Sequence, residues 1–166
     1  RVKKDTVQTI FVNHPEPPTQ TYNSVTDEEP AHMLNSQTII SATRCLQSNG
    51  KGRLIIVTDN LIYARLICQT VVRVLENNNE LVGLQGSEVR DLRRIESFGR
   101  SSVHLYEGQP SASIGHFTPN RFDRGTSYFD RLWRTGAGKH ADMRKRFIIA
   151  LRTSGGESIS YGSKGD

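Results

Sequence analysis

The chain has 166 residues, of which 35% are hydrophobic and 23% charged, and this composition is typical of one soluble globular domain. No apolar run approaches the roughly 18 residues that a membrane-spanning helix needs, so the sequence argues against an integral membrane protein. The formal net charge of +5 favours a polyanionic partner such as nucleic acid, although a basic surface without any partner is the competing interpretation.

The first predicted element is a strand over Thr6–Val12, which is β-branched and aromatic with Gln8 as its only strongly polar interior residue. A proline-rich loop ends this strand, because proline fixes its own backbone and lacks a donor. The loop carries Asn13, His14 and Glu16. These side chains either form a stiff polar site or are simply solvated beside a turn.

A helix, a strand and a second helix are predicted next. Apolar residues recur at helical spacing over Ala31–Ser48 and again over roughly Leu61–Glu76. Between them Leu54–Val57 is a continuous apolar strand, which is typical of a parallel sheet covered on both faces. Either Asp59 or Asn60 can cap the second helix, and capping is a strong structural explanation for Asp59.

The second half of the chain is less regular. The charged segment 86–100 has no clear pattern, and a long loop is expected where Gly, Pro and Ser are frequent. One α/β domain is expected over residues 1–152, followed by a flexible Gly/Ser-rich tail over residues 153–166. The remaining predicted elements are a short strand over Glu80–Gln85, a strand over Val103–Tyr106, the loop Gln109–Arg124, a short helix from Thr126 or Ser127 to Arg134, and a final strand over Arg146–Leu151.

This alternation of strands and helices predicts an α/β fold with a mainly parallel sheet. Ligands bind such sheets beyond the carboxyl ends of the strands. The proline loop with Glu16 follows one strand, and Thr58 and Asp59 follow the next, so both are expected on the same rim. A carboxylate there can accept hydrogen bonds from a base edge, and His14 can exchange a proton near neutral pH.

The cysteines and histidines show no pattern of a metal site. Cys45 and Cys68 lie among apolar residues of the predicted helices and are expected to be buried free thiols. The five histidines lack close ligand spacing, so no metal is expected.

Three segments, in order, resemble the tRNA (guanine-N7) methyltransferase family. IFVNHPEPP, residues 10–18, is similar to a strand followed by the family's Phe-Pro-Asp-Pro-Trp motif, with Glu16 at the place of the Asp. Residues 42–67 are similar to the family's helix, glycine turn, strand, Thr-Asp pair and Tyr-bearing helix, and here Thr58, Asp59 and Tyr63 match. Residues 125–151 are similar to its last segment, in which Thr126 and Tyr128 match.

The resemblance implies the C-terminal part of a Rossmann-like methyltransferase fold, with a mainly parallel sheet and an antiparallel final strand. It implies that S-adenosylmethionine is the cofactor and that N7 of a guanine in tRNA, or in another RNA, is methylated. Glu16 and Asp59 would be the catalytic residues, and the substrate would be bound by Asn13, His14, Thr58, Thr126, Tyr128 and Asp130.

The resemblance also implies that the glycine-rich cofactor turn would lie before Arg1. On this interpretation the chain is a fragment, it is inactive alone, and its cofactor-binding residues are unknown. The strand Thr6–Val12 would then have an open edge, through which the chain could form a homodimer. An intracellular location, cytoplasmic or nuclear, is expected, and an organelle remains open.

A second function is compatible with the same residues. The Trp of the family's motif is Pro18 here, and the acidic stretch 19–30 replaces the basic run that would follow the motif. Both differences favour a non-catalytic RNA-binding or assembly subunit that has kept the methyltransferase fold. The retained Thr58 and Asp59 favour the enzyme.

Overall fold

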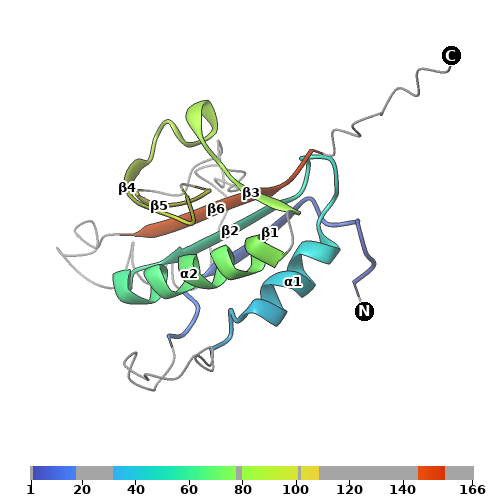
Figure 1. Ribbon diagram of the computed structural model, residues 1–166, viewed down its shortest axis with the longest axis horizontal. Coiled ribbons are helices and arrows are strands. Elements are labelled where there is room, and N and C mark those ends of the chain that lie inside the picture. Colours follow the sequence, from blue (N-terminus) through green and yellow to red (C-terminus); the bar gives the residue numbers. More distant parts are fainter. Residues whose placement is uncertain (1, 18–31, 78–79, 101, 109–145, 156–166) are drawn as a thin grey trace, which may run out of the picture.

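A computed structural model of the protein describes residues 2–17, 32–77, 80–100, 102–108 and 146–155. These residues form an α/β structure with a mixed sheet of six strands and two α-helices (Figure 1). The elements are β1 (Thr9–Asn13), α1 (Ser36–Cys45), β2 (Arg53–Thr58), α2 (Leu61–Asn77), β3 (Leu81–Gly83), the 3-10 helix η1 (Gly86–Val89), β4 (Arg93–Phe98), β5 (Val103–Glu107) and β6 (Phe147–Thr153).

The strand order is β1-β2-β6-β5-β4, and β3 pairs with β6 beside β5. The last strand in the chain therefore lies in the middle of the sheet, antiparallel to β2 along its whole length. On its other side, β6 pairs antiparallel with β5 through residues 147–149 and with β3 through residues 151–153. The expected antiparallel final strand is confirmed.

The expectation of a mainly parallel sheet is wrong. Only β1 and β2 are parallel, and the other pairs are antiparallel. The apolar run of β2 is buried on both faces because the strand is interior, as predicted, but burial does not depend on the direction of the neighbouring strands. β4 lies within the charged segment 86–100, for which the sequence predicted no element, and it forms a hairpin with β5, which was predicted over Val103–Tyr106.

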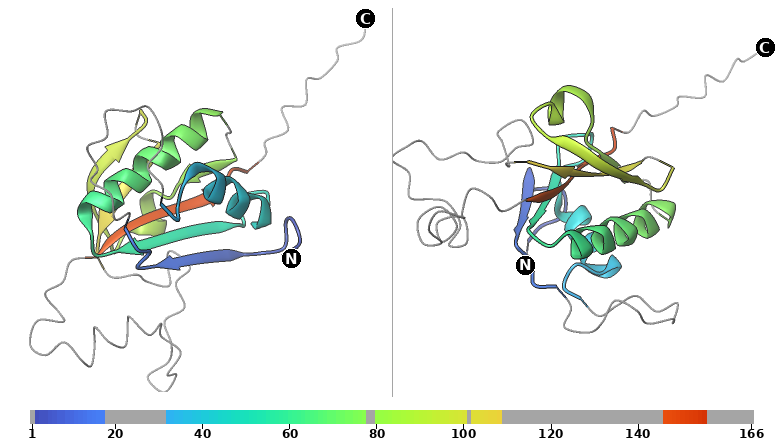
Figure 2. Two further views of the ribbon diagram at one scale, coloured as in Figure 1. Left: turned by 90° about the horizontal axis from the view of Figure 1, so that it is seen from below. Right: turned by 90° about the vertical axis from the view of Figure 1, so that its left-hand side faces the viewer.

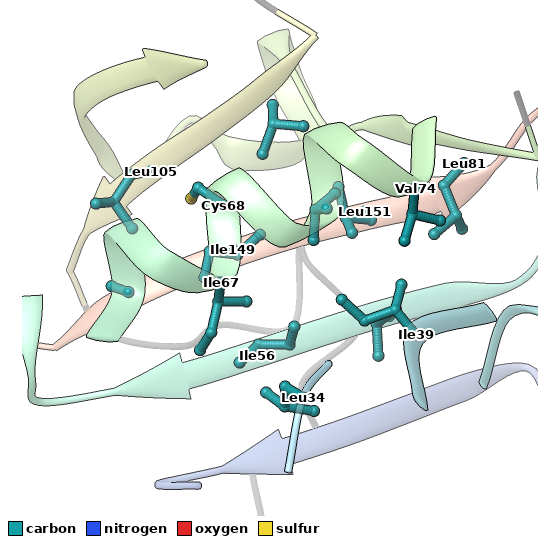
Figure 3. Close-up of a cluster of buried hydrophobic side chains, with 14 of the residues drawn as sticks. Leu34, Ile39, Ile56, Ile67, Cys68, Val74, Leu81, Leu105, Ile149 and Leu151 are labelled. Carbon is teal, nitrogen blue, oxygen red and sulfur yellow. The ribbon is translucent and has the colours of Figure 1, made fainter. Parts of the chain in front are cut away.

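Both helices pack on the same face of the sheet (Figure 2). The core between the helices and the sheet contains Leu54 and Ile56 of β2 together with Ile149 and Leu151 of β6. Ile67 of α2 packs in the same core (Figure 3). Every second residue of each strand faces this core, because the pleat turns successive side chains to opposite faces of the sheet. The main hydrophobic core of the described domain thus lies on the face of the sheet that the two helices cover.

A second, smaller core covers the opposite face of the same strands. Ile55 and Val57 of β2 and Ile148 of β6 pack there against Leu84 and Val89, which belong to the segment between β3 and β4. Tyr106 also joins this core, and its hydroxyl donates to the carbonyl of Leu84 at 2.7 Å. The two cores together explain why β2 and β6 are apolar at nearly every position.

The predicted elements between residues 6 and 107 exist, with shifted ends. The first helix starts only at Ser36, because Asn35 caps it by accepting from the Thr38 N–H at 2.9 Å. The final strand extends to Thr153, the first residue of the expected tail. The predicted helix from Thr126 to Arg134, the loop before it and residues 156–166 lie outside the described residues. Neither described helix has the length and apolar character to span a bilayer.

Candidate functional site

The carboxyl ends of β1 and β2 lie side by side. Their parallel register pairs Asn13 with Val57, and the His14 N–H extends the pairing by donating to the Val57 carbonyl at 2.7 Å. His14 then adopts a left-handed backbone with φ of 48°, which turns the chain into the proline loop, and Pro15 beside it is buried. The end of β1 is therefore fixed next to the turn that follows β2.

His14 and Asp59 are brought together at this rim. Nδ1 of His14 lies 3.8 Å from Oδ1 of Asp59, which is within ion-pair range when the imidazole is protonated and too long for a direct hydrogen bond. The His14 side chain is 10% exposed and that of Asp59 is 38% exposed. The Asp59 carboxylate is thus accessible from solvent, while the imidazole beside it is largely covered.

The turn between β2 and α2 is held by its own polar side chains. The buried Thr58 hydroxyl accepts from the Asn60 N–H at 3.2 Å. Asn60 caps α2, because its Oδ1 accepts from the Tyr63 N–H at 2.9 Å and its carbonyl accepts from the Ala64 N–H at 2.9 Å. Of the two alternatives in the sequence, Asn60 is the cap, so capping does not account for Asp59.

A contact between His32 and Tyr63 supports the same turn and was not predicted. Nδ1 of His32 lies 3.3 Å from the Tyr63 hydroxyl, and the rings meet edge to face at 5.6 Å. Both side chains are buried, and Tyr63 belongs to the first turn of α2. The two residues are 31 positions apart, so no local pattern in the sequence could have linked them.

The remaining predicted site residues lie partly at the end of β1 and partly outside the described residues. Asn13 is half-buried at the end of β1, and Glu16 is exposed two residues beyond His14. The rim therefore carries Asn13, His14, Thr58 and Asp59, and Glu16 follows on the loop beyond it. The predicted substrate-binding residues Thr126, Tyr128 and Asp130 lie outside the described residues.

The described residues contain no group of three or more His, Cys, Asp or Glu side chains that could hold a metal ion. Cys45 and Cys68 are both free thiols. Burial, with Glu96 as a smaller cause, raises the pKa of the Cys68 thiol well above its usual range, so this group is not nucleophilic at neutral pH. Cys45 is half-buried rather than buried as predicted.

Comparisons with known proteins found no matching family model, no matching curated protein and no matching solved structure. The function is therefore argued from the geometry of the rim and from the motifs in the sequence.

Proposed function

We propose that this domain is the base-binding part of a divergent S-adenosylmethionine-dependent RNA methyltransferase of the tRNA guanine-N7 type. The observation that carries the proposal is the rim, where two parallel strand ends bring His14 and Asp59 to within 3.8 Å of each other. A pocket beyond the carboxyl ends of adjacent parallel strands is where α/β sheets bind their ligands.

The position of β6 supports the same proposal. The chain returns from the far side of the sheet and inserts its last strand antiparallel beside β2. The resemblance to the methyltransferase family implies an antiparallel final strand, and β6 agrees with that part of it, whereas the mainly parallel sheet that it also implies is not found. The segments that carry the resemblance, residues 10–18 and 42–67, include the two adjacent strands that form the rim.

The chemistry of guanine suits a rim with carboxylates. N7 already has an in-plane lone pair, so the enzyme mainly has to orient the base. Guanine presents N–H donors at N1 and at its exocyclic amino group, and the oxygens of Asp59 or Glu16 can accept from them. Methylation at N7 leaves the ring positively charged, and a nearby carboxylate stabilises that charge. Half-buried Asn13 would add a polar group to the lining, and buried Thr58 would act indirectly, by holding the turn that carries Asp59.

The described residues do not provide the glycine-rich turn with which methyltransferases bind their cofactor. The turn after β1 consists of His14 and the proline loop, and the turn after β2 is Thr58, Asp59 and Asn60. Neither contains a glycine. We therefore assign no described residue to S-adenosylmethionine, and the roles proposed here concern only the base.

A non-catalytic RNA-binding or assembly subunit is the second candidate. It is favoured by the absence of a glycine from both rim turns and by the His14 imidazole beside the Asp59 carboxylate. A protonated His14 would compete with guanine for that carboxylate.

Two measurements separate these functions. Transfer of a labelled methyl group from S-adenosylmethionine to bulk tRNA tests for the enzyme, and calorimetry with guanosine and adenosine monophosphates tests for the base site. The cofactor turn would lie before Arg1, so the transfer assay uses the protein together with whatever sequence precedes Arg1. The enzyme predicts label at guanine N7 in that assay and a preference of the chain itself for guanosine monophosphate. RNA binding with neither of these results would favour the non-catalytic subunit.

Calorimetry of the variant Asp59→Asn tests the role of this carboxylate in base binding. The substitution keeps the size of the side chain but replaces an acceptor oxygen with a donor. We expect guanosine monophosphate to bind at least about ten-fold more weakly, as loss of a charge-assisted hydrogen bond costs roughly 1.5–3 kcal/mol. Asp91→Asn is the matched control, because Asp91 is an exposed carboxylate in the segment between η1 and β4. Equal affinity in both variants would refute the role of Asp59.

A further inference from the structure

We propose that a basic hollow at the opposite end of the sheet binds RNA phosphates. The hollow has a volume of about 490 Å³ and is lined by Val2, Lys3, Lys4, Arg44 and Cys45. The inference goes beyond the base site, and it applies equally to a methyltransferase and to a non-catalytic RNA-binding subunit.

Backbone hydrogen bonds build this basic hollow by fixing the start of the chain against the end of α1. The Asp5 N–H donates to the Arg44 carbonyl at 3.1 Å, and the Thr6 and Val7 N–H groups donate to the Cys45 carbonyl at 3.1 and 2.9 Å. Val7 and Leu46 then form a parallel β-bridge. Lys3 and Lys4 are therefore held beside Arg44 by the fold.

Two carboxylates, Asp5 and Glu80, line the neighbouring cavity that shares Lys4 and Arg44 with the basic hollow. Asp5 has a left-handed backbone with φ of 61°, and its Oδ1 accepts from the Ser48 N–H at 2.6 Å. The lining of the basic hollow contains three cationic side chains and no carboxylate. Within the described residues, Lys3, Lys4 and Arg44 form no salt bridge and are all exposed.

Three arginines elsewhere in the described domain are paired with carboxylates. Arg53 lies 3.2 Å from Glu88, Arg65 lies 2.8 Å from Glu96, and Arg93 pairs with Glu107. Those positive charges are compensated within the protein, whereas the charges of the basic hollow are available to an external anion. Cations without acidic neighbours are the electrostatic footprint of a polyanion-binding surface.

Basic residues at a helix C-terminus also stabilise the helix dipole, which gives Arg44 and Lys4 a purely structural explanation. That dipole corresponds to only about half a negative charge. The carbonyls of Arg44 and Cys45 already accept the N–H groups of residues 5–7. Three cations therefore exceed what the end of α1 requires, and a surplus positive charge remains.

The basic hollow and the rim lie at opposite ends of β1 and β2, because the hollow is beside the amino end of β1 and the rim follows the carboxyl ends. β2 has six residues, and its five steps of roughly 3.3 Å put the two ends about 17 Å apart. A folded RNA is long enough to place phosphates in the hollow while one of its bases reaches the rim. The hollow would supply affinity, and the rim would supply base selectivity.

The test is RNA binding by fluorescence anisotropy across a salt series, with labelled tRNA and a labelled single-stranded RNA. The triple variant Lys3→Gln, Lys4→Gln, Arg44→Gln is compared with a control, Arg73→Gln, Arg90→Gln, Arg100→Gln. The control removes the same charge from exposed positions on α2, after η1 and in the β4–β5 turn. The single variant Lys4→Glu is a milder alternative if the triple variant does not fold.

We expect the hollow variant to bind RNA at least ten-fold more weakly at low salt, with a salt slope that is smaller by about 2, and the control to bind nearly as the parent chain does. Binding of guanosine monophosphate should be unchanged, so failure of this proposal is distinguishable from failure of the base site. Equal losses in both triple variants, or no loss in either, would overturn it. The proposal is also wrong if the hollow variant retains RNA binding but loses binding to phosphatidylserine vesicles.

Discussion

At the start of α2, two adjacent polar residues have different tasks. Asn60 satisfies the first N–H groups of the helix, while Asp59 lies at the rim within 3.8 Å of His14. The sequence permitted either residue to be the cap, because both are good N-cap residues in adjacent positions. The hydrogen bond from the Tyr63 N–H decides between them.

Replacing Asn60 with Ala should lower the free energy of unfolding by about 1 kcal/mol, the usual effect of losing an N-cap. Asp59→Ala should change it by no more than about 0.5 kcal/mol, since partly exposed ion pairs contribute little. Urea denaturation of both variants tests this difference. A larger loss for Asp59→Ala would show that Asp59 has a structural role.

His104 makes stability depend on pH. It is buried in β5, with Nδ1 3.0 Å from the Ser97 hydroxyl, and burial, followed by the nearby Arg94, lowers the pKa of its imidazole below 6.5. The folded state therefore favours the neutral imidazole, while the unfolded chain protonates near pH 6.5. The stability that depends on neutral His104 is complete above that pH and is lost as pH falls through the lowered folded pKa.

Urea denaturation between pH 7.5 and 5 should show this loss in the parent chain. The variant His104→Gln cannot titrate at that position, so its stability should fall less over the same range. Parallel pH profiles for the two proteins would contradict the prediction.

At the scale of elements, the connection between α1 and β2 is tightly packed. It passes through Asn49 and Gly50, both left-handed with φ of 59° and 75°, and then through Gly52. The Gly52 N–H donates to the Gln47 carbonyl at 2.9 Å, and a Cβ added at Gly52 would lie 2.4 Å from that carbonyl oxygen. The backbone must therefore move to accept any side chain at this position.

Gly52→Ala should consequently destabilise the protein by roughly 1–3 kcal/mol through overpacking. Gly86→Ala is the control, because it has left-handed φ of 61° but nothing within 4 Å of an added Cβ. Its cost should come from the backbone alone, at about 1 kcal/mol. Thermal unfolding of the two variants checks the order, and a greater loss for Gly86→Ala would show that the connection can relax.

At the scale of the whole molecule, β6 joins parts of the sheet that are distant in sequence. It separates β2 from β5 and β3, and its side chains alternate between the two cores. Ile149 is fully buried in the main core and belongs to the segment of β6 that pairs with both β2 and β5. The sheet of the described domain therefore depends on residues near position 150.

The variant Ile149→Ala should lower the free energy of unfolding by about 2–5 kcal/mol, because it leaves a cavity in the centre of the sheet. Ile62→Ala is the control, since Ile62 is 58% exposed on α2 and should cost much less. Denaturation followed by circular dichroism measures both. Similar losses would mean that β6 contributes no more than the surface of α2.

The formation of a homodimer through the edge of the sheet stays a prediction. β1 is at the end of the strand order among the described residues, which is where a homodimer through the sheet edge was expected. Sedimentation of the chain across a concentration series would test self-association.

The sequence by itself determined the local structure of the described domain. The apolar run of β2 and the helical spacing of α2 fixed these elements, because burial and periodicity are properties of neighbouring residues. It also placed His14 and Asp59 at strand ends, so their meeting at one rim could be expected. The charged segment 86–100 had no clear period, and β4 within it was missed.

Only the tertiary structure decided which strands pair and in which direction. The place of β6 between β2 and β5, the capping of α2 by Asn60 and the contact of His32 with Tyr63 all depend on residues or hydrogen bonds that a local pattern does not specify. A strand buried on both faces has the same apolar composition whether its neighbours run with it or against it. Strand direction is set by long-range packing. The expectation of a mainly parallel sheet failed because the apolar pattern of a strand carries no information about that direction.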